Sequence, residues 1–503
     1  MRGLFRSSTV AVVLLPLVLT CIASPSRAAQ VSPWVDTAVA GGGSADLLVV
    51  LAEQADLGAA AATPDLSARR QAVRDALWEA AERGQRPLRE WLDARGVAYR
   101  PFFIVNAVLI EAADSALVAE LAARPEVARI EANPSIRQDL PRPQAGSGGD
   151  GPDAVEWNVT TVGAEQMWAA GFTGQGIVVG NADTGIDWDH PALRNQYRGW
   201  NGTSADHDYS WHDAIHSGGG ICGADSPVPC DDYGHGTLTN GVSVGDDGGA
   251  NRIGVAPGAR WIGCRNMNQG FGTPASYLEC MEFFLAPYPI GGTPAQGDPA
   301  MAPDVTNNSW TCPPDEGCSW DTLQAAVEAQ RAAGILTVAA AGNGGPSCSS
   351  VEDPIAIYDA TFSVGATDSG DAIASLSSRG PVLADGSGRL KPDITAPGVD
   401  VRSSSPGGSY GSASGTSLAS PHVAGVVALL WSASPALRGR VDATEAILGR
   451  TALARTSSQC GDPPGAIPNN VYGWGRVDAF AAWQVFSDGF DSGNLTAWTS
   501  AND

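Results

Sequence analysis

The chain has 503 residues, of which 43% are hydrophobic, and it carries a formal net charge of −24. This composition excludes wholesale disorder, and the length allows more than one domain with a large core. From Gln144 onward there are 38 acidic and 15 basic residues, against 15 and 12 in residues 46–142. The acidity therefore belongs to the larger second part, where it argues against nucleic-acid binding, because phosphate contacts need Lys and Arg.

The amino terminus has the pattern of a secretory signal peptide. Arg2 and Arg6 precede an apolar run over residues 10–22, and small residues follow up to residue 29. The run is short for a stable membrane span, so the pattern predicts a signal peptide over residues 1–29 and a secreted, bacterial protein. A single-span anchor and a lipoprotein modified at Cys21 are the alternatives. No other run is expected to span a bilayer, so no membrane contact is expected once the signal is removed.

Nine cysteines occur, and eight remain once Cys21 leaves with the signal. An even number in an exported chain predicts disulfides. Short spacings make Cys222–Cys230 and Cys312–Cys318 candidate pairs, although connectivity cannot be deduced from spacing. The alternative is a zinc site, but no CxxC pair or matching His spacing supports one.

Residues 46–138 have the pattern of a small α+β unit. Apolar runs predict strands, and apolar residues at helical spacing predict helices. The predicted strands cover 47–51, 102–110 and 127–130, and the predicted helices cover 67–83, 88–94 and 113–123.

The stretch "PRPQAGSGGDGP" is rich in Gly and Pro, and it predicts an exposed linker within residues 139–154. From 155 to 485 short apolar strands alternate with helical segments. The predicted strands lie at 177–181 and 335–340, and the predicted helices at 322–333 and 418–431. This alternation predicts an α/β domain with a parallel sheet covered on both faces. Residues 486–503 are predicted to be a tail.

Three segments contain the residues that activate a hydroxyl nucleophile. They are "NADTGID" with Asp183, "YGHGTLTNG" with His235, and "SGTSLASPHVAG" with Ser417. An imidazole takes the serine proton during attack, and a carboxylate orients the imidazole and stabilises its cation. Taken singly, each residue has a structural alternative: a turn or cap for the Asp, a loop histidine for the His, and a helix cap for the Ser.

The three motifs together, in the order Asp, His, Ser, resemble those of the subtilisin-like serine proteases, peptidase family S8. The flanking sequences "GQGIVVGNADTGIDWDHPALRNQYRGW", "SSRGPV" and "LKPDITAPGVDV" are similar to the bacillopeptidase F-like branch. The resemblance covers about residues 156–482. It implies a three-layer α/β/α fold with a mostly parallel sheet. It also implies a secreted serine endopeptidase that hydrolyses proteins or peptides through an acyl-enzyme, needs no cofactor for its chemistry and acts as a monomer.

A fourth motif, "TVAAAGNGGPS", contains Asn343. By the family pattern, its amide and the Ser417 N–H donate to the oxyanion that forms during attack. Losing one such donor typically costs about 10²–10³ in rate. The alternative is that Asn343 and Gly344 only form a turn.

The segment "TNNSWTC", residues 306–312, resembles the edge strand that pairs with the substrate backbone in this family. It implies that Ser309 and Trp310, together with Ala341 and Gly342, bind substrate. Thr311 stands where the family usually has Gly, so the shape of the primary pocket is open. The alternative is an ordinary core strand.

Residues 46–138 resemble, in length, position and order of elements, the family's inhibitor I9-like propeptide, a small ferredoxin-like unit. The resemblance implies that this unit assists folding and then occupies the active site as an intramolecular inhibitor. We therefore predict that the chain cuts itself between Asp139 and Ala154.

Other residues near these motifs are expected to have structural roles. Leu418 stands where many relatives carry Met, and His422 is expected to be structural. The acidic pairs Asp231–Asp232 and Asp246–Asp247 could hold structural calcium, but solvated loops are preferred, and no metal is expected in the catalytic site.

Three other classes of protein are alternatives to a subtilisin-like protease. A non-catalytic binding protein on a protease scaffold would have no need for Asn343. A lipase would carry its serine in a Gly-x-Ser-x-Gly elbow and place it first in the triad, whereas Ser417 comes last. A serine-carboxyl peptidase would have Glu in place of His235.

Overall fold

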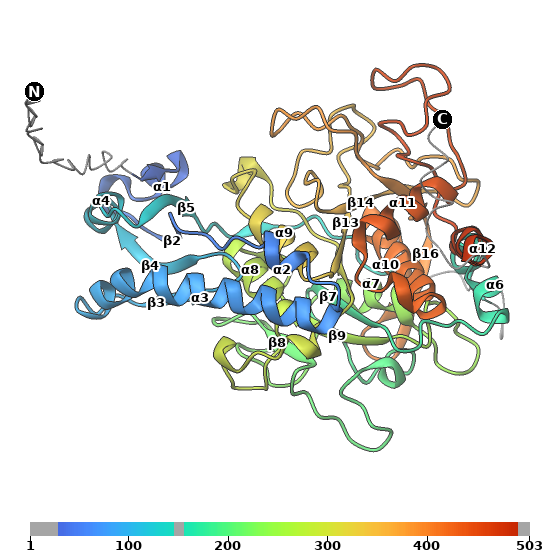
Figure 1. Cartoon of the computed structure of the whole chain (residues 1–503), viewed down its shortest axis with the longest axis horizontal. Helices are drawn as coiled ribbons and strands as arrows, with labels where there is room; N and C mark the ends of the chain where they lie inside the picture. The colour runs from blue at the N-terminus through green and yellow to red at the C-terminus, as the bar shows by residue number, and fades with distance from the viewer. Residues whose placement is uncertain (1–28, 145–154, 491–503) are drawn as a thin grey trace, which may run out of the picture.

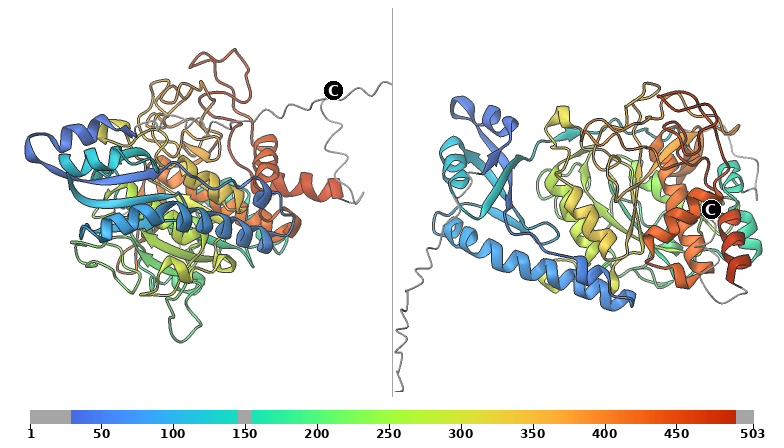
Figure 2. Two further views of the ribbon diagram at one scale, coloured as in Figure 1. Left: turned by 60° about the vertical axis from the view of Figure 1, so that its left-hand side comes forward. Right: turned by 45° about the horizontal axis from the view of Figure 1, so that its top comes forward.

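The structure is a computed structural model, and it describes residues 29–144 and 155–490. A small amino-terminal unit lies beside a larger unit, and the long helix of the small unit runs along the surface of the larger one (Figures 1 and 2). Apart from Ala29, the predicted signal peptide lies outside the described residues. The glycine-rich part of the linker, 145–154, and residues 491–503 of the predicted tail lie outside them as well.

The small unit has a five-stranded sheet in the order β1-β5-β2-β4-β3. Two helices connect its strands, which gives the β-α-β-β-α-β order of a ferredoxin-like unit and confirms the predicted class. The sheet also includes β1, which precedes the predicted start at residue 46. The elements are β1 (Gln30–Val31), β2 (Ser44–Leu51), α3 (Leu66–Asp93), β3 (Tyr99–Phe102), β4 (Ala107–Asp114), α4 (Ser115–Ala122) and β5 (Val127–Ala132).

The long helix of the small unit corrects the prediction of two separate helices. α3 runs without interruption for 28 residues and includes Pro87. Proline in a helix interior removes a hydrogen bond and normally ends the helix. Here Leu88 and Leu92 are fully buried, as Val73 is earlier in the helix, so packing continues past the proline. Tertiary burial therefore outweighs the local cost.

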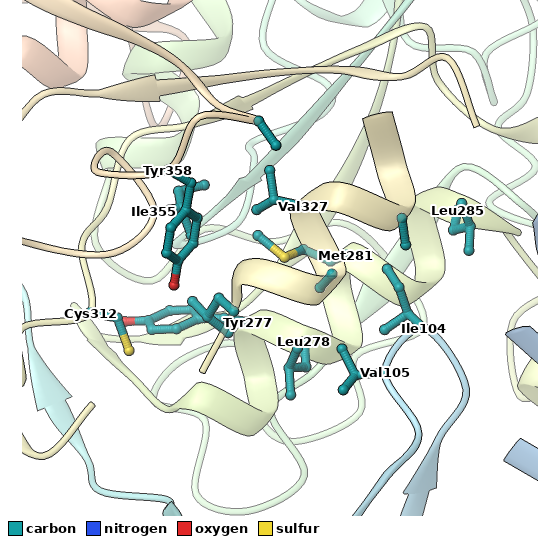
Figure 3. Close-up of a cluster of buried hydrophobic side chains, with 14 of the residues drawn as sticks. Ile104, Val105, Tyr277, Leu278, Met281, Leu285, Cys312, Val327, Ile355 and Tyr358 are labelled. Carbon is teal, nitrogen blue, oxygen red and sulfur yellow. The ribbon is translucent and has the colours of Figure 1, made fainter. Parts of the chain in front are cut away.

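The apolar run at 102–110 is not the single strand that was predicted. β3 ends at Phe102 and β4 begins at Ala107, with a tight turn between them. The turn residues Phe103, Ile104 and Val105 are buried because they pack against the larger unit. Figure 3 shows Ile104 and Val105 beside Leu278 and Leu285 of helix α8. An apolar turn covered by another unit looks like a strand in sequence.

The larger unit has a seven-stranded sheet in the order β15-β14-β13-β12-β7-β9-β8, in which every neighbouring pair is parallel. Its strands are β7 (Val178–Asp183), β8 (Trp211–Asp213), β9 (Arg260–Arg265), β12 (Val305–Asn308), β13 (Leu336–Ala340), β14 (Phe362–Thr367) and β15 (Ile394–Pro397).

Helices cover both faces of this sheet. α7 and α10 pack together on one side, and α8 and α9 pack together on the other. Their bounds are α7 (His235–Val244), α8 (Pro274–Leu285), α9 (Gln324–Ala332) and α10 (Thr416–Ala433). The three-layer α/β/α prediction is confirmed.

Helix α10 lies at the centre of the larger unit. It is long and apolar enough to cross a bilayer, which the sequence analysis did not anticipate, but 89% of it is buried inside the protein. It contacts strands β12, β13, β14 and β15, and its apolar residues from Ala419 to Trp431 belong to one of the two large core clusters. α10 is therefore a core helix.

The carboxyl-terminal helix α12 (Ala479–Phe490) continues past residue 485, where the tail was predicted to begin. It packs against α10 and α11 (Val441–Thr451). α12 therefore includes residues 486–490, which were predicted to belong to the tail.

All eight remaining cysteines form disulfides, as predicted. Both short-range candidates are present, Cys222–Cys230 and Cys312–Cys318. The other two bonds are Cys264–Cys280, which joins β9 to α8, and Cys348–Cys460, which spans 112 residues. Sequence spacing could not predict these two disulfides, because their cysteines come together only in the folded chain.

Candidate active site

Asp183 and His235 meet at the carboxyl end of the parallel sheet. Asp183 is the last residue of β7, and His235 is the first residue of α7. The His235 Nδ1 atom lies 2.7 Å from Asp183 Oδ1, and both side chains are fully buried. The close approach requires glycine at 236, because a Cβ there would lie 2.0 Å from the Gly185 carbonyl oxygen. The Asp183 carboxylate thus fixes the orientation of the imidazole.

Two further donors hold the Asp183 carboxylate. The Thr184 N–H donates to Oδ1 at 2.7 Å, and Thr239 Oγ1 donates to Oδ2 at 3.3 Å. Thr239 lies on α7, the same helix that carries His235. These two donors, together with His235, fix the orientation of the Asp183 carboxylate.

Asp231 secures the start of α7, which corrects its interpretation as part of a solvated acidic loop. It is buried, and it accepts the backbone N–H groups of Tyr233, Gly234 and Thr237 at 3.0, 2.7 and 2.9 Å. Helix N–H groups left without partners favour such a cap. Asp231 therefore helps to position His235.

The neighbouring Asp232 is not a solvated residue either. Its side chain is buried against Arg265, with Nη2 and Oδ2 3.2 Å apart. Burial raises the pKa of Asp232 to about 6, although a backbone hydrogen bond and the Arg265 charge oppose the shift. Asp232, in the loop before His235, therefore has a structural role through its ion pair with Arg265 of β9.

Ser417 is the second residue of α10 and is 3% exposed. A methyl group on Gly415 would lie 3.4 Å from Ser417 Oγ, 3.5 Å from Asn343 Nδ2 and 3.3 Å from Pro141 Cγ. These three groups therefore surround one small space at the start of α10. His235 Nε2 is buried and has no hydrogen-bond partner within the described residues, so the imidazole has an unused nitrogen to exchange a proton.

Pro421 lies in the second turn of α10. Its missing N–H leaves the carbonyl of Ser417, four residues earlier, without its helical donor. Ser309 Oγ donates to that carbonyl at 3.0 Å and lies 2.9 Å from Ser420 Oγ. Ser309, which directly follows strand β12, thus supplies the hydrogen bond to Ser417 that Pro421 cannot make.

Asn343 follows β13, and its side-chain oxygen is held by Thr416. The Thr416 N–H and Oγ1 donate to Asn343 Oδ1 at 2.9 and 3.0 Å. Thr416 Oγ1 in turn accepts the Gly342 N–H at 3.2 Å. With Oδ1 fixed, the Asn343 Nδ2 donor faces the space beside Ser417.

The four residues predicted to bind substrate, Ser309, Trp310, Ala341 and Gly342, make different kinds of contact. Ser309 braces α10, and Trp310 is buried with its ring stacked on Tyr277, the centroids 4.0 Å apart. Ala341 donates its N–H to Val364, and Gly342 belongs to the Thr416 network. All four residues therefore have structural contacts within the protein, and their binding of substrate stays a prediction.

The edge-strand interpretation of residues 306–312 is corrected. β12 is an interior strand, paired with β7 on one side and β13 on the other. Only the residues after Asn308 extend beyond the sheet. The main chain of Thr311 there contacts the small unit, through Gln138.

His422 is placed away from the catalytic groups. Its Nδ1 lies 2.7 Å from the Leu418 carbonyl oxygen and its Nε2 lies 2.8 Å from Asn158 Nδ2. Burial lowers the pKa of His422 to about 4, despite the hydrogen bond to Leu418. A neutral imidazole that donates from Nδ1 and accepts at Nε2 satisfies both contacts, which supports a structural role.

The chain after the small unit crosses this site. β6 (Ile136–Arg137) pairs antiparallel with β11 (Phe271–Gly272), and the Gln138 N–H donates to the Gly270 carbonyl at 2.9 Å. Next along the chain, Leu140 is buried and its carbonyl accepts from Tyr233 Oη at 3.2 Å.

The same segment continues over the starts of α7 and α10. Pro141 lies beside Gly415, and Pro143 lies near Gly234, the residue before His235. Gln144 then exchanges both backbone hydrogen bonds with Ser412 of β17 (Ser409–Ala413), each at 2.9 Å. Residues 136–144 thus lie between β11 on one side and Thr311 on the other and continue over the start of α10, which carries Ser417; we refer to the path that this segment occupies as the groove.

Several functional neighbours were missed by the sequence interpretation. Thr416, Tyr233 and Gln138 act through contacts with residues far away in sequence. Of these three residues, Thr416 was the easiest to identify from the sequence, because it directly precedes Ser417 in the motif.

Within residues 29–144 and 155–490, no group of three or more His, Cys, Asp or Glu side chains could hold a metal ion. The acidic pairs considered for calcium have other partners. Asp231 and Asp232 are used as described above, and Asp247 accepts N–H groups from Gly249 and Asn251. These residues do not fit a calcium site, and structural calcium elsewhere stays a prediction.

Comparison with known proteins agrees with this geometry. The model of the subtilase family, peptidase S8, matches residues 174–475. Bacillopeptidase F of Bacillus subtilis (strain 168) is 42% identical over 349 residues, which are 67% of this chain but 22% of that protein. The chain therefore spans less than a quarter of this relative.

Shorter relatives align over most of their own length. Subtilisin Savinase of Lederbergia lenta is 31% identical over 330 residues, covering 65% of this chain and 98% of that protein. Subtilisin E of Bacillus subtilis (strain 168) is 28% identical over 364 residues, covering 71% and 80%. The chain belongs to the subtilase family of serine-type endopeptidases, which need no cofactor for catalysis.

Proposed function

We propose that this chain is the zymogen of a secreted endopeptidase in which Asp183, His235 and Ser417 form the catalytic triad. The observation that carries the proposal is the 2.7 Å contact between Asp183 and His235, next to the space shared by Ser417 Oγ and Asn343 Nδ2. Proteins and peptides are its substrates, and it cuts within chains.

Each group has one role in the proposed reaction. Ser417 Oγ attacks the substrate carbonyl while His235 Nε2 takes its proton, and Asp183 stabilises the imidazolium. Asn343 Nδ2 and the Ser417 N–H donate to the oxyanion. His235 then returns the proton to the leaving amine, and a water molecule releases the acyl group by the same steps.

We propose that the small unit inhibits the enzyme to which it is joined. Residues 136–144 lie across the groove, where His235 is fully buried and Ser417 is 3% exposed, and Pro141 lies beside the same glycine, Gly415, as Ser417 Oγ. A substrate could not reach Ser417 without displacing them. The proposed domains are a propeptide over 46–138, a processing region over 139–154 and a catalytic domain over 155–485, with 1–29 as signal and 486–503 as tail.

Polar and apolar contacts anchor the small unit. Arg70 on α3 forms a buried ion pair with Asp304 at 2.9 Å, and it donates to the Pro303 carbonyl at 3.0 Å. In the turn after β3, the N–H groups of Phe103 and Ile104 donate to Glu282 on α8 at 2.5 and 3.0 Å. These four contacts, at two separate places, favour one docked orientation.

Secretion is supported by the signal pattern at 1–29 and by four disulfides, which persist in oxidising surroundings. The acidic surface of the catalytic unit disfavours nucleic-acid partners. We propose a monomer that contacts no membrane after the signal is removed.

The test compares purified secreted protein with its Ser417→Ala variant on a diverse peptide library, with cleavage determined by mass spectrometry. The proposal predicts cleavage by the natural chain only. It also predicts that diisopropyl fluorophosphate adds its phosphoryl group to Ser417 and abolishes activity. Equal cleavage by the variant would refute the role of Ser417.

A further inference from the structure

The Gln138 side chain is bound at both ends of its carboxamide. Gln138 Oε1 accepts the Thr311 N–H at 3.0 Å, and Gln138 Nε2 donates to the Thr311 carbonyl at 2.6 Å. Nε2 also donates to Tyr277 Oη at 3.0 Å. One acceptor and two donor positions of the amide are therefore matched by fixed groups of the catalytic unit.

The surroundings of this amide are closed and rigid. Gln138 is 6% exposed, and Tyr277 is fully buried with its ring stacked on Trp310 at an angle of 11°. Figure 3 shows the Tyr277 hydroxyl directed toward Cys312, the residue after Thr311. This turn is fixed by the Cys312–Cys318 disulfide and by a hydrogen bond from the Cys312 N–H to the Pro354 carbonyl. A side chain that enters here meets polar groups that are already in place.

These groups distinguish the carboxamide from side chains of similar size. A Glu would place a second acceptor oxygen against the Thr311 carbonyl, which cannot donate. A Met would fill the space but leave the Thr311 N–H and carbonyl buried without partners, which costs free energy. An Asn would be one methylene too short to reach both Thr311 groups while its own main chain stays paired.

The main chain around Gln138 is held independently of its side chain. Ile136 and Arg137 pair with Gly272 and Phe271, and the Gln138 N–H donates to Gly270. The side chain is therefore free to bind Thr311 on the opposite wall of the groove. One wall recognises the peptide backbone, and the other recognises this one side chain.

We propose that Thr311 and Tyr277 form a carboxamide pocket that makes the endopeptidase select glutamine in its substrates, two residues before the position of Leu140. The inference rests on the proposed function, because it requires that residues 136–140 lie in the groove as a substrate does. Gln138 is then the occupant of the pocket in the zymogen, and a substrate glutamine replaces it after maturation.

The test uses the mature enzyme and synthetic peptides Asn-Pro-Ser-Ile-Arg-X-Asp-Leu-Ala-Arg, which correspond to residues 133–142 with Pro141 replaced by Ala. X is Gln, Glu, Met or Asn. Mass spectrometry identifies the bond that is cut, and kcat/KM is measured for each peptide. Peptides that resist cleavage are ranked by their inhibition constants against casein hydrolysis instead.

We expect the Gln peptide to exceed the Met and Asn peptides by about 10- to 100-fold, with Glu the poorest, as for a buried polar group left unpaired. A control peptide with Met at the exposed position of Arg137 should differ from its parent by less than about threefold. A Tyr277→Phe enzyme keeps the aromatic stack, and its Gln-to-Met ratio should fall about fivefold.

The outcomes separate the two proposals. If the enzyme hydrolyses casein but treats Gln, Met and Glu peptides alike, the carboxamide pocket is overturned and the proposed function stands. If the enzyme is inert toward casein and all peptides, the proposed function fails, and this inference fails with it. An unchanged Gln-to-Met ratio in the Tyr277→Phe enzyme would remove Tyr277 from the pocket and contradict its stated composition.

Discussion

Thr416 holds the Asn343 side chain through two hydrogen bonds to a single oxygen atom, from its backbone N–H at 2.9 Å and its hydroxyl at 3.0 Å. Because Oδ1 is fixed in this way, the amide donor on Nδ2 can point only toward the groove. The residue directly before Ser417 thus positions the proposed oxyanion donor without touching the substrate.

Replacing this hydroxyl tests the arrangement. We expect Thr416→Val to lower kcat about tenfold and leave KM nearly unchanged, because one of two restraints on Asn343 is lost. Asn343→Leu should lower kcat by about 10²–10³. Thr416→Ser keeps the hydroxyl and serves as the control, with kcat near that of the natural enzyme. A Thr416→Val enzyme with the kcat of the natural enzyme would contradict the role of the hydroxyl.

The buried pair between Arg70 and Asp304 predicts an effect on zymogen stability. Arg70→Met in the uncleavable Ser417→Ala chain should reduce its free energy of unfolding by about 1–3 kcal/mol, because a buried carboxylate loses a partner. Arg438 still donates to Asp304, which keeps the loss below that of an isolated buried charge.

The matched control is Arg83→Met on the same helix. Arg83 pairs with Glu53 on the exposed side, where ion pairs contribute little. Urea unfolding of the three proteins gives the comparison. Similar destabilisation by both substitutions would argue against Arg70 as an anchor.

A pH dependence follows from His216, which contacts Glu279, the carboxylate of the larger unit that pairs with Arg100 of the small unit. Its Nδ1 lies 2.5 Å from Asp225 Oδ1, and its Nε2 lies 2.9 Å from Glu279 Oε1; Glu279 also pairs with Arg100 of β3 and with His212. Burial lowers the pKa of His216, but the hydrogen bond and charge of Glu279 outweigh it, so the pKa is raised overall.

A raised pKa means that the folded chain binds this proton more tightly than the unfolded chain. The contribution of His216 is therefore complete below its unfolded pKa of about 6.5, and it is lost as the pH rises through the higher folded pKa. In the Ser417→Ala chain, His216→Asn should lower the melting temperature at pH 5.5 more than at pH 9.

His207 gives a control of opposite sign. Burial lowers the pKa of His207, although the charges of Asp206 and Asp208 oppose the shift. Its contribution is present above about pH 6.5 and is lost as the pH falls through the lower folded pKa. His207→Gln should therefore have the larger effect at pH 9. If both variants have the same pH dependence, the Glu279 network is not the source of the effect.

Leu418 predicts resistance to oxidation. It is fully buried beside Ser417 and packs with Leu238 and Val242, and it has no sulfur to oxidise. A methionine sulfoxide at this position would place a polar group next to the nucleophile. Peroxide should therefore inactivate the natural enzyme slowly and a Leu418→Met variant rapidly. Rapid inactivation of the natural enzyme, with oxidation mapped to methionines elsewhere, would contradict this explanation.

The positions of Asp183, His235 and Ser417 at strand and helix ends were accessible from sequence because each motif is local. Glycines next to these residues allow the close approach of β7, α7 and α10, and a buried strand or helix beside each motif has a clear apolar pattern. The layered fold followed from the same alternation of strands and helices.

Features that depend on contact between distant segments were not accessible. The turn at 103–106 has the composition of a strand because its apolar side chains are covered by α8. Asp231 and Asp232 look like solvated acids until the helix start and Arg265 are placed beside them. The contact of Gln138 with Thr311 joins residues 173 positions apart, and nothing local marks either of them.

The central claim is that residues 136–144 lie in the groove of Ser417 and that the chain cuts itself after the propeptide. The most direct measurement is to purify the natural and Ser417→Ala chains separately and follow their masses and new amino termini with time. The natural chain should be cut between Asp139 and Ala154 at a rate independent of its concentration, and the Ser417→Ala chain should remain intact. Cleavage of the purified Ser417→Ala chain at the same junction and rate would contradict the account.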